Sequence, residues 1–400
     1  MPAVEIRPDV YWIGVNDRTT DLFEGVWPVS NEGVSYNTYL INDEKKVIVD
    51  LVKALKTDEF FDQVNEVLPI AELDYVIINH MEPDHTGVLR TLSRMAPDVT
   101  IVGTAKMKTM LEAYYGITEN VMVVNDGDTL DLGSRTLKFV STPFVHWPET
   151  MMTYDVEDKI LFACDAFGGY GAMRGNIFDD GCKNLPFYEA ESLRYYTNIV
   201  SNFSKAVIKA IDKLADVEVN VIAPSHGLVW RSHPERIVEL YKRWADCAAG
   251  GCDTGVTLLY GSMYGNTEEV MNAVAQGIAS RDVQFDIFDV ARKHVSYILP
   301  SLWMNKGVLV GAPTYEGKLF PPMTQALEMA VLKHVKFKTC GYFGSYGWSK
   351  GALRTMDAIV TPAKWEMFET FEFHGGVTHA RLKEAEAYGR RFADALIASK

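Results

Sequence analysis

The chain has 400 residues, of which 48% are hydrophobic and 23% are charged, a composition that is typical of folded globular proteins and excludes a largely disordered chain. At roughly 150 residues per domain, this length predicts two or three domains. With 39 basic and 53 acidic residues the net charge is −14, which argues against a protein that binds nucleic acid or anionic membranes through a broadly basic surface.

The amino terminus lacks a basic stretch followed by an apolar core, so we expect no secretory signal. No apolar run approaches the ~20 residues of a membrane-spanning helix. The five cysteines are spread over the chain without a C-x-x-C pair. This pattern is typical of a reduced, cytoplasmic protein, and it indicates that the chain carries no rubredoxin-like or iron–sulfur centre of its own.

The first third of the chain shows short strand patterns followed by helical periodicity. Residues 35–41 and 46–50 are β-prone segments on either side of a polar turn, which predicts a hairpin. Residues 73–79 form an almost continuous apolar run, typical of a strand that is buried on both faces. Helical periodicity follows at residues 87–95 and 104–115. Strands covered by helices predict a layered α/β body of the αββα type.

A cluster of metal-capable side chains directly follows the buried strand predicted at residues 73–79. His80, Glu82, Asp84 and His85 fall within six residues. A strand-to-helix turn needs only one polar residue to cap the helix. Four such side chains exceed that need, so the pattern favours a metal site, with an ordinary capped turn as the alternative.

Three more candidate ligands follow strand patterns further along the chain: His146, Asp165 and His226. Each of them alone is more often a hydrogen-bonded core or loop residue than a ligand. Together with the first cluster they form a set of four imidazoles and three carboxylates. This set is richer in oxygen than the imidazole-dominated sites of zinc hydrolases, and it favours iron or manganese.

After about residue 248 the pattern changes to regular alternation of strands and helices, and residues 247–255 have the small-residue composition of a linker. Five strands in about 150 residues predict an open, doubly wound parallel sheet. We therefore predict two domains, residues 1–250 and 251–400. The five strands are expected at residues 256–260, 284–288, 307–310, 338–343 and 366–371.

A loop rich in Ser, Gly, Asn and Thr, residues 261–267, lies between the first predicted strand and helix of this sheet. Backbone N–H groups at a helix N-terminus can wrap a phosphate. The loop lacks the lysine of a Walker motif and the spacing of G-x-G-x-x-G, which disfavours ATP and dinucleotides. Taken alone, the loop is also compatible with a simple capped turn.

Two further loops, residues 311–317 and 344–349, follow the third and fourth predicted strands. All three loops therefore surround the crevice at the carboxyl ends of the strands, where ligands of this architecture bind. Tyr315, Tyr346 and Trp348 offer aromatic faces for the isoalloxazine ring of a flavin.

The string His-x-Glu-x-Asp-His at residues 80–85, followed by His-Trp-Pro-Glu at residues 146–149, resembles the flavodiiron proteins. These belong to the metallo-β-lactamase fold superfamily, whose usual second histidine is Glu82 here. The resemblance extends through residues 35–40, 164–168 and 223–227 and covers essentially the whole chain. It implies an N-terminal metallo-β-lactamase-like αββα sandwich followed by a flavodoxin-like domain.

The resemblance also implies the roles of individual residues. One iron would be held by His80, Glu82 and His146, the other by Asp84, His85 and His226, with Asp165 as the bridge. In some members of the family the histidine that matches His85 turns away from the metal. The flavodoxin-like loops imply FMN, with contacts expected from Ser262, Met263, Tyr264, Gly265, Asn266, Thr267, Pro313, Thr314, Tyr315, Glu316, Gly317, Ser345, Tyr346, Gly347 and Trp348. Family members commonly have an aspartate at the position of Gly261, so that acidic contact is absent here.

By resemblance, the function is reduction of dioxygen to water, of nitric oxide to nitrous oxide, or of both, because two ferrous ions and a reduced FMN together hold the four electrons that dioxygen requires. The resemblance further implies an external electron donor, namely a rubredoxin-like protein, a reductase or a reduced deazaflavin. It also implies a head-to-tail homodimer, which can pair into a dimer of dimers. Two alternatives remain open: a metallohydrolase with an accessory flavodoxin-like domain, and a flavodoxin-type electron shuttle with a vestigial metal domain.

Overall fold

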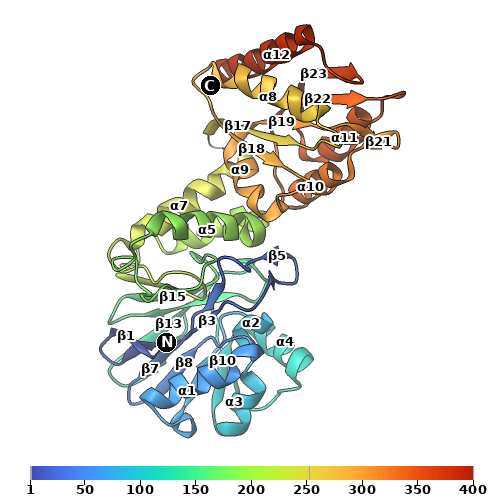
Figure 1. The fold of residues 1–400 in the computed structure, drawn as a ribbon. Coiled ribbons are helices and arrows are strands. Elements are labelled where there is room, and N and C mark those ends of the chain that lie inside the picture. The colour runs from blue at the N-terminus through green and yellow to red at the C-terminus, as the bar shows by residue number, and fades with distance from the viewer. Residues whose placement is uncertain (1, 252, 400) are drawn as a thin grey trace. The chain divides into compact units, whose positions relative to one another are not determined.

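The computed structural model describes residues 2–251 and 253–399. The chain forms two compact units, Met1–Lys242 and Arg243–Lys400, which run from blue to yellow-green and from yellow to red in Figure 1. The division falls within helix α7 (Pro234–Asp246). The sequence places the domain boundary a few residues later, in the small-residue segment that follows this helix.

The first unit contains a seven-stranded sheet in the order β1-β2-β7-β8-β9-β10-β11. Strands β7 and β8 pair in antiparallel fashion, which confirms the predicted hairpin, whereas β8 to β11 are parallel. The buried strand predicted at residues 73–79 is shorter in the structure and forms β9. The strands are β1 (Val4–Arg7), β2 (Val10–Trp12), β7 (Tyr39–Asn42), β8 (Lys46–Val49), β9 (Tyr75–Ile77), β10 (Thr100–Gly103) and β11 (Val121–Val123).

A second sheet of this unit has the order β12-β13-β14-β15-β16, antiparallel except for the parallel pair β15 and β16. The rings of Tyr39 from the first sheet and Phe162 from the second lie 5.2 Å apart, so the core lies between the two sheets. The strands are β12 (Thr129–Asp131), β13 (Thr136–Ser141), β14 (Met151–Asp155), β15 (Ile160–Cys164) and β16 (Val221–Pro224). Two short ribbons lie beside them, β3 (Val15–Asp17) with β6 (Val34–Tyr36), and β4 (Leu22–Phe23) with β5 (Trp27–Pro28).

Helices cover the outer faces of both sheets, as Figure 1 shows for α1, α3 and α4 on one side and α5 and α7 on the other. The predicted αββα sandwich is therefore confirmed. The helix predicted at residues 87–95 forms α3, and the short helix α2 that precedes it was not predicted. The helix predicted at residues 104–115 forms α4, whose N-terminus is capped by the Thr104 side chain. The helices are α1 (Thr57–Val67), α2 (Pro83–Thr86), α3 (Leu89–Met95), α4 (Ala105–Tyr115), α5 (Leu185–Tyr195), α6 (Ser204–Lys213) and α7.

The second unit is a five-stranded parallel sheet in the order β18-β17-β19-β22-β23, which confirms the prediction. A Cβ atom built at Gly277 of α8 would lie 2.0 Å from a carbonyl oxygen of α12, so glycine permits close packing of these two helices. The strands are β17 (Asp253–Tyr260), β18 (Gln284–Asp289), β19 (Asn305–Gly311), β22 (Thr339–Tyr346) and β23 (Glu366–His374). The helices are α8 (Asn266–Ala279), α9 (Leu299–Met304), α10 (Pro321–Leu332), α11 (Ala352–Val360) and α12 (His379–Ala398). A small hairpin, β20 (Thr314–Tyr315) with β21 (Lys318–Leu319), was not predicted.

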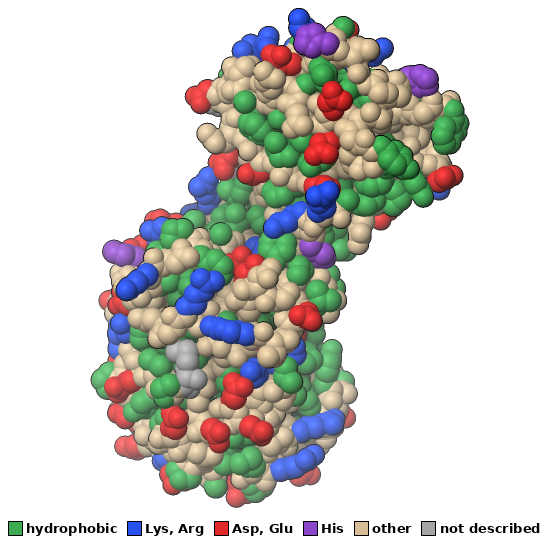
Figure 2. All heavy atoms as spheres, viewed as in Figure 1, with side chains coloured by type: hydrophobic (Ala, Val, Ile, Leu, Met, Phe, Trp, Pro, Cys, Tyr) green, Lys and Arg blue, Asp and Glu red, His purple; other side chains and the backbone are tan. Residues whose placement is uncertain are grey.

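Acidic and basic side chains are interspersed over the face of the molecule shown in Figure 2. This face therefore presents no continuous basic field of the kind that binds polyanions. Among the described residues, no helix combines the length and the apolar character required to cross a membrane.

Candidate metal centre and flavin site

The seven predicted metal ligands lie where strands of the first unit end. The segment from His80 to His85 follows β9 and includes α2, and His146 lies in the loop between β13 and β14. Asp165 directly follows β15, and His226 follows β16 after one intervening residue. Because β15 and β16 are parallel neighbours, their carboxyl ends place these two side chains at the same edge of the sheet.

His80, Glu82, His146 and Asp165 form one group of converging ligand atoms. The Nε2 atoms of His146 and His80 lie 3.1 and 3.3 Å from Oε2 of Glu82. The same two nitrogen atoms lie 3.3 and 3.4 Å from Oδ2 of Asp165. Two imidazoles and two carboxylates thus surround one point.

Asp84, His85 and His226 form a second group. The Nε2 atoms of His85 and His226 lie 3.1 and 3.3 Å from Oδ1 of Asp165. Nε2 of His226 is also 3.4 Å from Oδ2 of Asp84, and Nε2 of His85 is 3.6 Å from Oδ1 of Asp84. Each oxygen of Asp165 therefore faces a different pair of histidines, which is the arrangement of a bridging carboxylate.

These side chains fit metal ions better than they fit one another. Within the described part of the chain, both carboxylate oxygens of Asp84 and of Asp165, both ring nitrogens of His85 and Nε2 of His226 are buried without a well-oriented hydrogen bond. Buried charges are normally paired or coordinate metals, since leaving them unsatisfied is costly. The lone pairs converge on two points, as ligands of two cations do.

The pKa values of the cluster follow from the same crowding. Burial by itself lowers the pKa of a histidine, but close contacts with Asp165 and neighbouring carboxylates outweigh burial and raise the pKa of His226 to about 10 and that of His146 to about 9. Burial raises the pKa of Asp165, but His85 and the other histidines outweigh it and hold that pKa well below its ordinary value. Without metal, these shifts favour protonated imidazoles beside an ionised Asp165. Bound metal ions would replace those protons, because a ligating imidazole is neutral.

The outward-facing nitrogens of two candidate ligands have different partners. Nδ1 of His80 lies 2.7 Å from Oε1 of Glu149, and Nδ1 of His226 lies 2.7 Å from the carbonyl oxygen of Ser35. Glu149 closes the His-Trp-Pro-Glu segment, but no role was predicted for it. A carboxylate three residues after a candidate ligand is the signal that could have identified it.

Aromatic side chains contact histidines of both groups. The rings of Phe23, Tyr36 and Tyr195 lie 5.5, 5.8 and 5.6 Å from that of His226, and the Trp147 ring lies 4.9 Å from that of His80. These contacts shield the imidazoles from water. Phe23 and Tyr195 were not predicted, since nothing in their local sequence connects them with the ligands.

The three predicted flavin loops lie together at the carboxyl edge of the parallel sheet of the second unit, after β17, β19 and β22. Oγ1 of Thr267 in the first loop is 3.4 Å from Oγ of Ser345 in the third, and Oγ1 of Thr314 in the second accepts a hydrogen bond from the N–H of Ala352. The structure thus brings the first loop to the third and the second loop to the start of α11. The other predicted contacts lie in these same loops: Ser262, Met263, Tyr264, Gly265, Asn266, Pro313, Tyr315, Glu316, Gly317, Tyr346, Gly347 and Trp348.

The first loop has the features of a phosphate site. Gly265 precedes α8 with φ +95°, a left-handed conformation that glycine adopts without strain. The backbone N–H groups that follow it lie at the N-terminus of the helix, where such groups can bind a phosphate. Tyr264 and Trp348 are 88% and 89% exposed, and a planar ligand could cover such aromatic surface. Nε2 of His374, at the end of β23, donates a hydrogen bond to the carbonyl oxygen of Gly347. This contact was not predicted.

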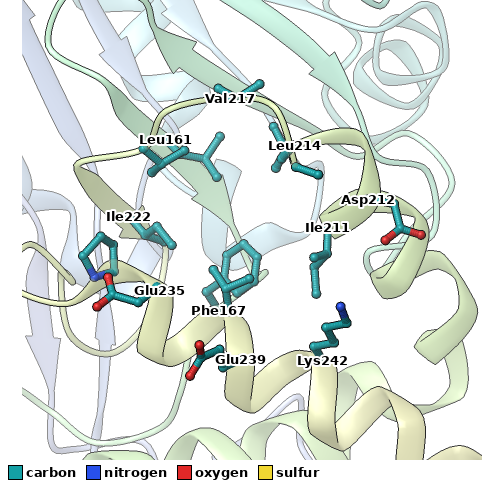
Figure 3. A pocket seen from close by; sticks show the side chains of 14 residues that line it. Leu161, Phe167, Ile211, Asp212, Leu214, Val217, Ile222, Glu235, Glu239 and Lys242 are labelled. Atoms are coloured by element: carbon teal, nitrogen blue, oxygen red, sulfur yellow. The ribbon is translucent and has the colours of Figure 1, made fainter.

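A separate cavity of about 360 Å³ lies in the first unit, where α6 and α7 cover the second sheet. Figure 3 shows Leu161 and Ile222 from that sheet among its lining side chains, with Phe167 near the centre. None of the seven candidate ligands lines this cavity. The converging ligand atoms around Asp165 are therefore separate from this cavity.

Comparisons with known proteins agree with this architecture. Residues 34–227 match the model of the ODP family beta lactamase, and residues 258–389 match that of flavodoxin. The chain is 36% identical over 397 residues to the anaerobic nitric oxide reductase flavorubredoxin of Escherichia coli, covering 98% of this chain and 82% of the relative. The flavodiiron protein of Giardia intestinalis superposes with a TM-score of 0.93 at 29% identity, covering 100% of this chain and 97% of that one. The rubredoxin oxygen:oxidoreductase of Desulfovibrio gigas also gives a TM-score of 0.93, at 27% identity and 99% coverage of both chains.

Fold and site together define a lactamase-like metal domain joined to a flavodoxin-like domain. The chain belongs to the flavodiiron protein family, and the resemblance stated from its motifs is confirmed.

Proposed function

We propose that this chain is an oxidoreductase that reduces dioxygen to water, nitric oxide to nitrous oxide, or both, at a non-haem diiron site that receives its electrons through FMN. The observation that carries the proposal is the division of the Asp165 carboxylate between two histidine pairs. Relatives of both kinds support it, since one is named a nitric oxide reductase and another an oxygen oxidoreductase.

In the ligand set that we propose, each iron has two histidines and one carboxylate of its own, and Asp165 is shared. His85 is included because its Nε2 atom faces Asp165 and its ring is buried. The residues are His80, Glu82 and His146 for one iron, Asp84, His85 and His226 for the other, and Asp165 as the bridge.

Bound iron and FMN would supply gas binding and electrons, while the protein supplies orientation and shielding. Asp165 sets the spacing of the two metal positions. Phe23 and Tyr195 line the histidine side of the second position and limit access of water. In the other unit, Thr267 is buried at the start of α8, where it can contact the flavin phosphate.

The proposal extends to the partners of the chain. The metal ligands and the flavin loops lie in different compact units, and a head-to-tail homodimer would place the FMN of one subunit near the diiron centre of the other. A rubredoxin-like protein, a reductase or a reduced deazaflavin would supply the electrons. The name of the Desulfovibrio gigas relative favours the first of these. We further propose a cytoplasmic location.

The metallohydrolase alternative is less well supported. Glu82 replaces the histidine of the hydrolase signature, and a hydrolase has no use for three aromatic-bearing flavin loops. Metal and flavin analysis of the purified protein separates the candidates. If the proposal is correct, the protein is yellow and contains about two irons per chain. Its reduced form is then reoxidised by dioxygen or nitric oxide in stopped-flow experiments. Zinc without redox activity would favour the hydrolase, and a flavin without metal would favour the electron shuttle.

A further inference from the structure

The two candidate metal positions differ in the hydrogen-bond partner of the histidine Nδ1 atoms, which face away from the metal. His80, at the first position, has Nδ1 2.7 Å from Oε1 of Glu149. His226, at the second position, directs Nδ1 to a neutral backbone carbonyl at the same distance. The other histidine of the second position, His85, has a buried Nδ1 without a hydrogen-bond partner among the described residues.

The pair of His80 and Glu149 is completely enclosed. Both side chains have no exposed surface, and Oε1 of Glu149 also accepts the N–H of Met81 at 3.0 Å. The carboxylate is therefore held in place by two donors. This contact orients the His80 ring so that Nε2 faces Glu82 and Asp165.

A second buried carboxylate, Asp50, lies near the other metal position without acting on a histidine in this way. Asp50, His85 and Cys164 offer ligand atoms within 4.8 Å of one another. The two oxygens of Asp50 instead accept the backbone and side-chain N–H groups of Asn79, at 2.8 and 3.0 Å. The carboxylate–histidine contact is thus found at the first position, whereas the second has a carboxylate that is occupied elsewhere.

We infer that Glu149 acts through His80 to make the two metal positions chemically unequal, so that the iron held by His80, Glu82 and His146 is bound more tightly and is oxidised more readily than its neighbour. A carboxylate that accepts the far N–H of a ligating histidine makes that imidazole a stronger donor. A stronger donor stabilises the more highly charged ferric ion. The inference rests on the proposed ligand assignment, and Glu149 is a positioning residue in it, not a ligand.

The variant Glu149→Gln tests the charge without removing the hydrogen bonds. The glutamine oxygen can still accept the N–H groups of His80 and Met81, but it is neutral. The matched control is Asp50→Asn, which alters a buried carboxyl group near the second position that accepts no hydrogen bond from a histidine. Flavin content and circular dichroism of each variant verify folding.

The primary measurement is the release of iron from the holoprotein to a chelator. The parent protein should release its iron in two phases of equal amplitude. Glu149→Gln should accelerate the slow phase by about 10- to 100-fold and leave the fast phase unchanged, and Asp50→Asn should leave the slow phase unchanged. His80→Ala should lack the slow phase and His226→Ala the fast one, which assigns the phases to the positions.

Mössbauer spectra of protein enriched in ⁵⁷Fe and oxidised by one electron give a second readout that a purely structural role would not change. Ferric iron should occupy the slow-releasing position in the parent protein and should be shared between both positions in Glu149→Gln. Release in a single phase from the parent, equal acceleration of both phases, or acceleration of the slow phase by Asp50→Asn would each overturn the inference alone. Retention of both irons by His80→Ala would overturn the ligand assignment itself.

Discussion

Nε2 of His85 lies 3.1 Å from Oδ1 of Asp165, in the interior of the first unit. The His85 ring is thereby turned toward the second metal position, whereas in some flavodiiron proteins the matching histidine turns away. His85 directly follows Asp84 in the short helix α2, and its Nε2 atom also lies 3.6 Å from Oδ1 of Asp84.

The shared carboxylate leads to the first prediction. Asp165→Ala should reduce the iron content from about two per chain to about one or fewer and remove magnetic coupling between the irons, because both positions lose a ligand. FMN absorbance should persist, since the flavin loops lie in the other unit. Iron analysis and Mössbauer or EPR spectra of the purified variant check this, with Asp155→Asn as a control that alters a buried carboxylate outside the cluster. Two coupled irons in Asp165→Ala would rule out the bridge.

The second prediction concerns the independence of the flavin unit. A fragment comprising residues 243–400 should fold and bind FMN. Its sheet packs against α8 and α12 to form a hydrophobic core of its own, and all three flavin loops belong to the fragment. It should consume neither dioxygen nor nitric oxide. Flavin fluorescence quenching on titration measures binding, and Thr267→Glu, which places a charge at the phosphate, is the negative control. A folded fragment that does not bind FMN would show that the loops do not form a flavin site.

A third prediction concerns Lys338, which is buried and donates hydrogen bonds to the carbonyl oxygens of Trp303 and Asn305. Burial lowers the pKa of Lys338 to about 7. Between that value and the ordinary pKa of lysine, the unfolded chain binds the additional proton, so the free energy of unfolding should rise with pH, by on the order of 4 kcal/mol from pH 7 to pH 10.

Urea unfolding of the 243–400 fragment at pH 7, 8, 9 and 10 measures this slope. Lys338→Met should flatten it, while Lys383→Met, which replaces an exposed lysine of α12, should leave it unchanged. If the free energy of unfolding has the same pH slope in the unsubstituted fragment and in its Lys338→Met variant, the buried lysine is not the source of the slope.

The fourth prediction tests electron transfer between subunits. One chain carries His80→Ala with Asp165→Ala, and the other carries Asn266→Asp with Thr267→Glu. Each homodimer should be inactive. In a head-to-tail heterodimer the intact flavin of the first chain faces the intact diiron centre of the second, so refolding the mixture should restore gas reduction in proportion to the heterodimer formed. Electron transfer confined to one chain predicts no recovery, because neither chain then holds both working centres.

The sequence by itself determined the chemical inventory and its placement at strand ends. His80, Asp165 and His226 follow apolar strand patterns, and the loop at residues 261–267 lies between a strand and a helix. Such patterns are local, since periodicity and turn composition depend on neighbouring residues. They were sufficient for the αββα and parallel-sheet architectures, although the ends of β9 differed from the prediction and the short helix α2 was not predicted.

Only the tertiary structure decided how these residues meet. Which oxygen of Asp165 faces which histidine, the inward turn of His85, and the contrast between Glu149 and the Ser35 carbonyl behind two of the ligands all depend on side-chain orientation and on contacts between distant segments. Phe23 approaches His226 across some two hundred residues of chain. Local sequence carries no record of such contacts, because they arise when the two sheets pack and fix each rotamer against neighbours from elsewhere in the chain.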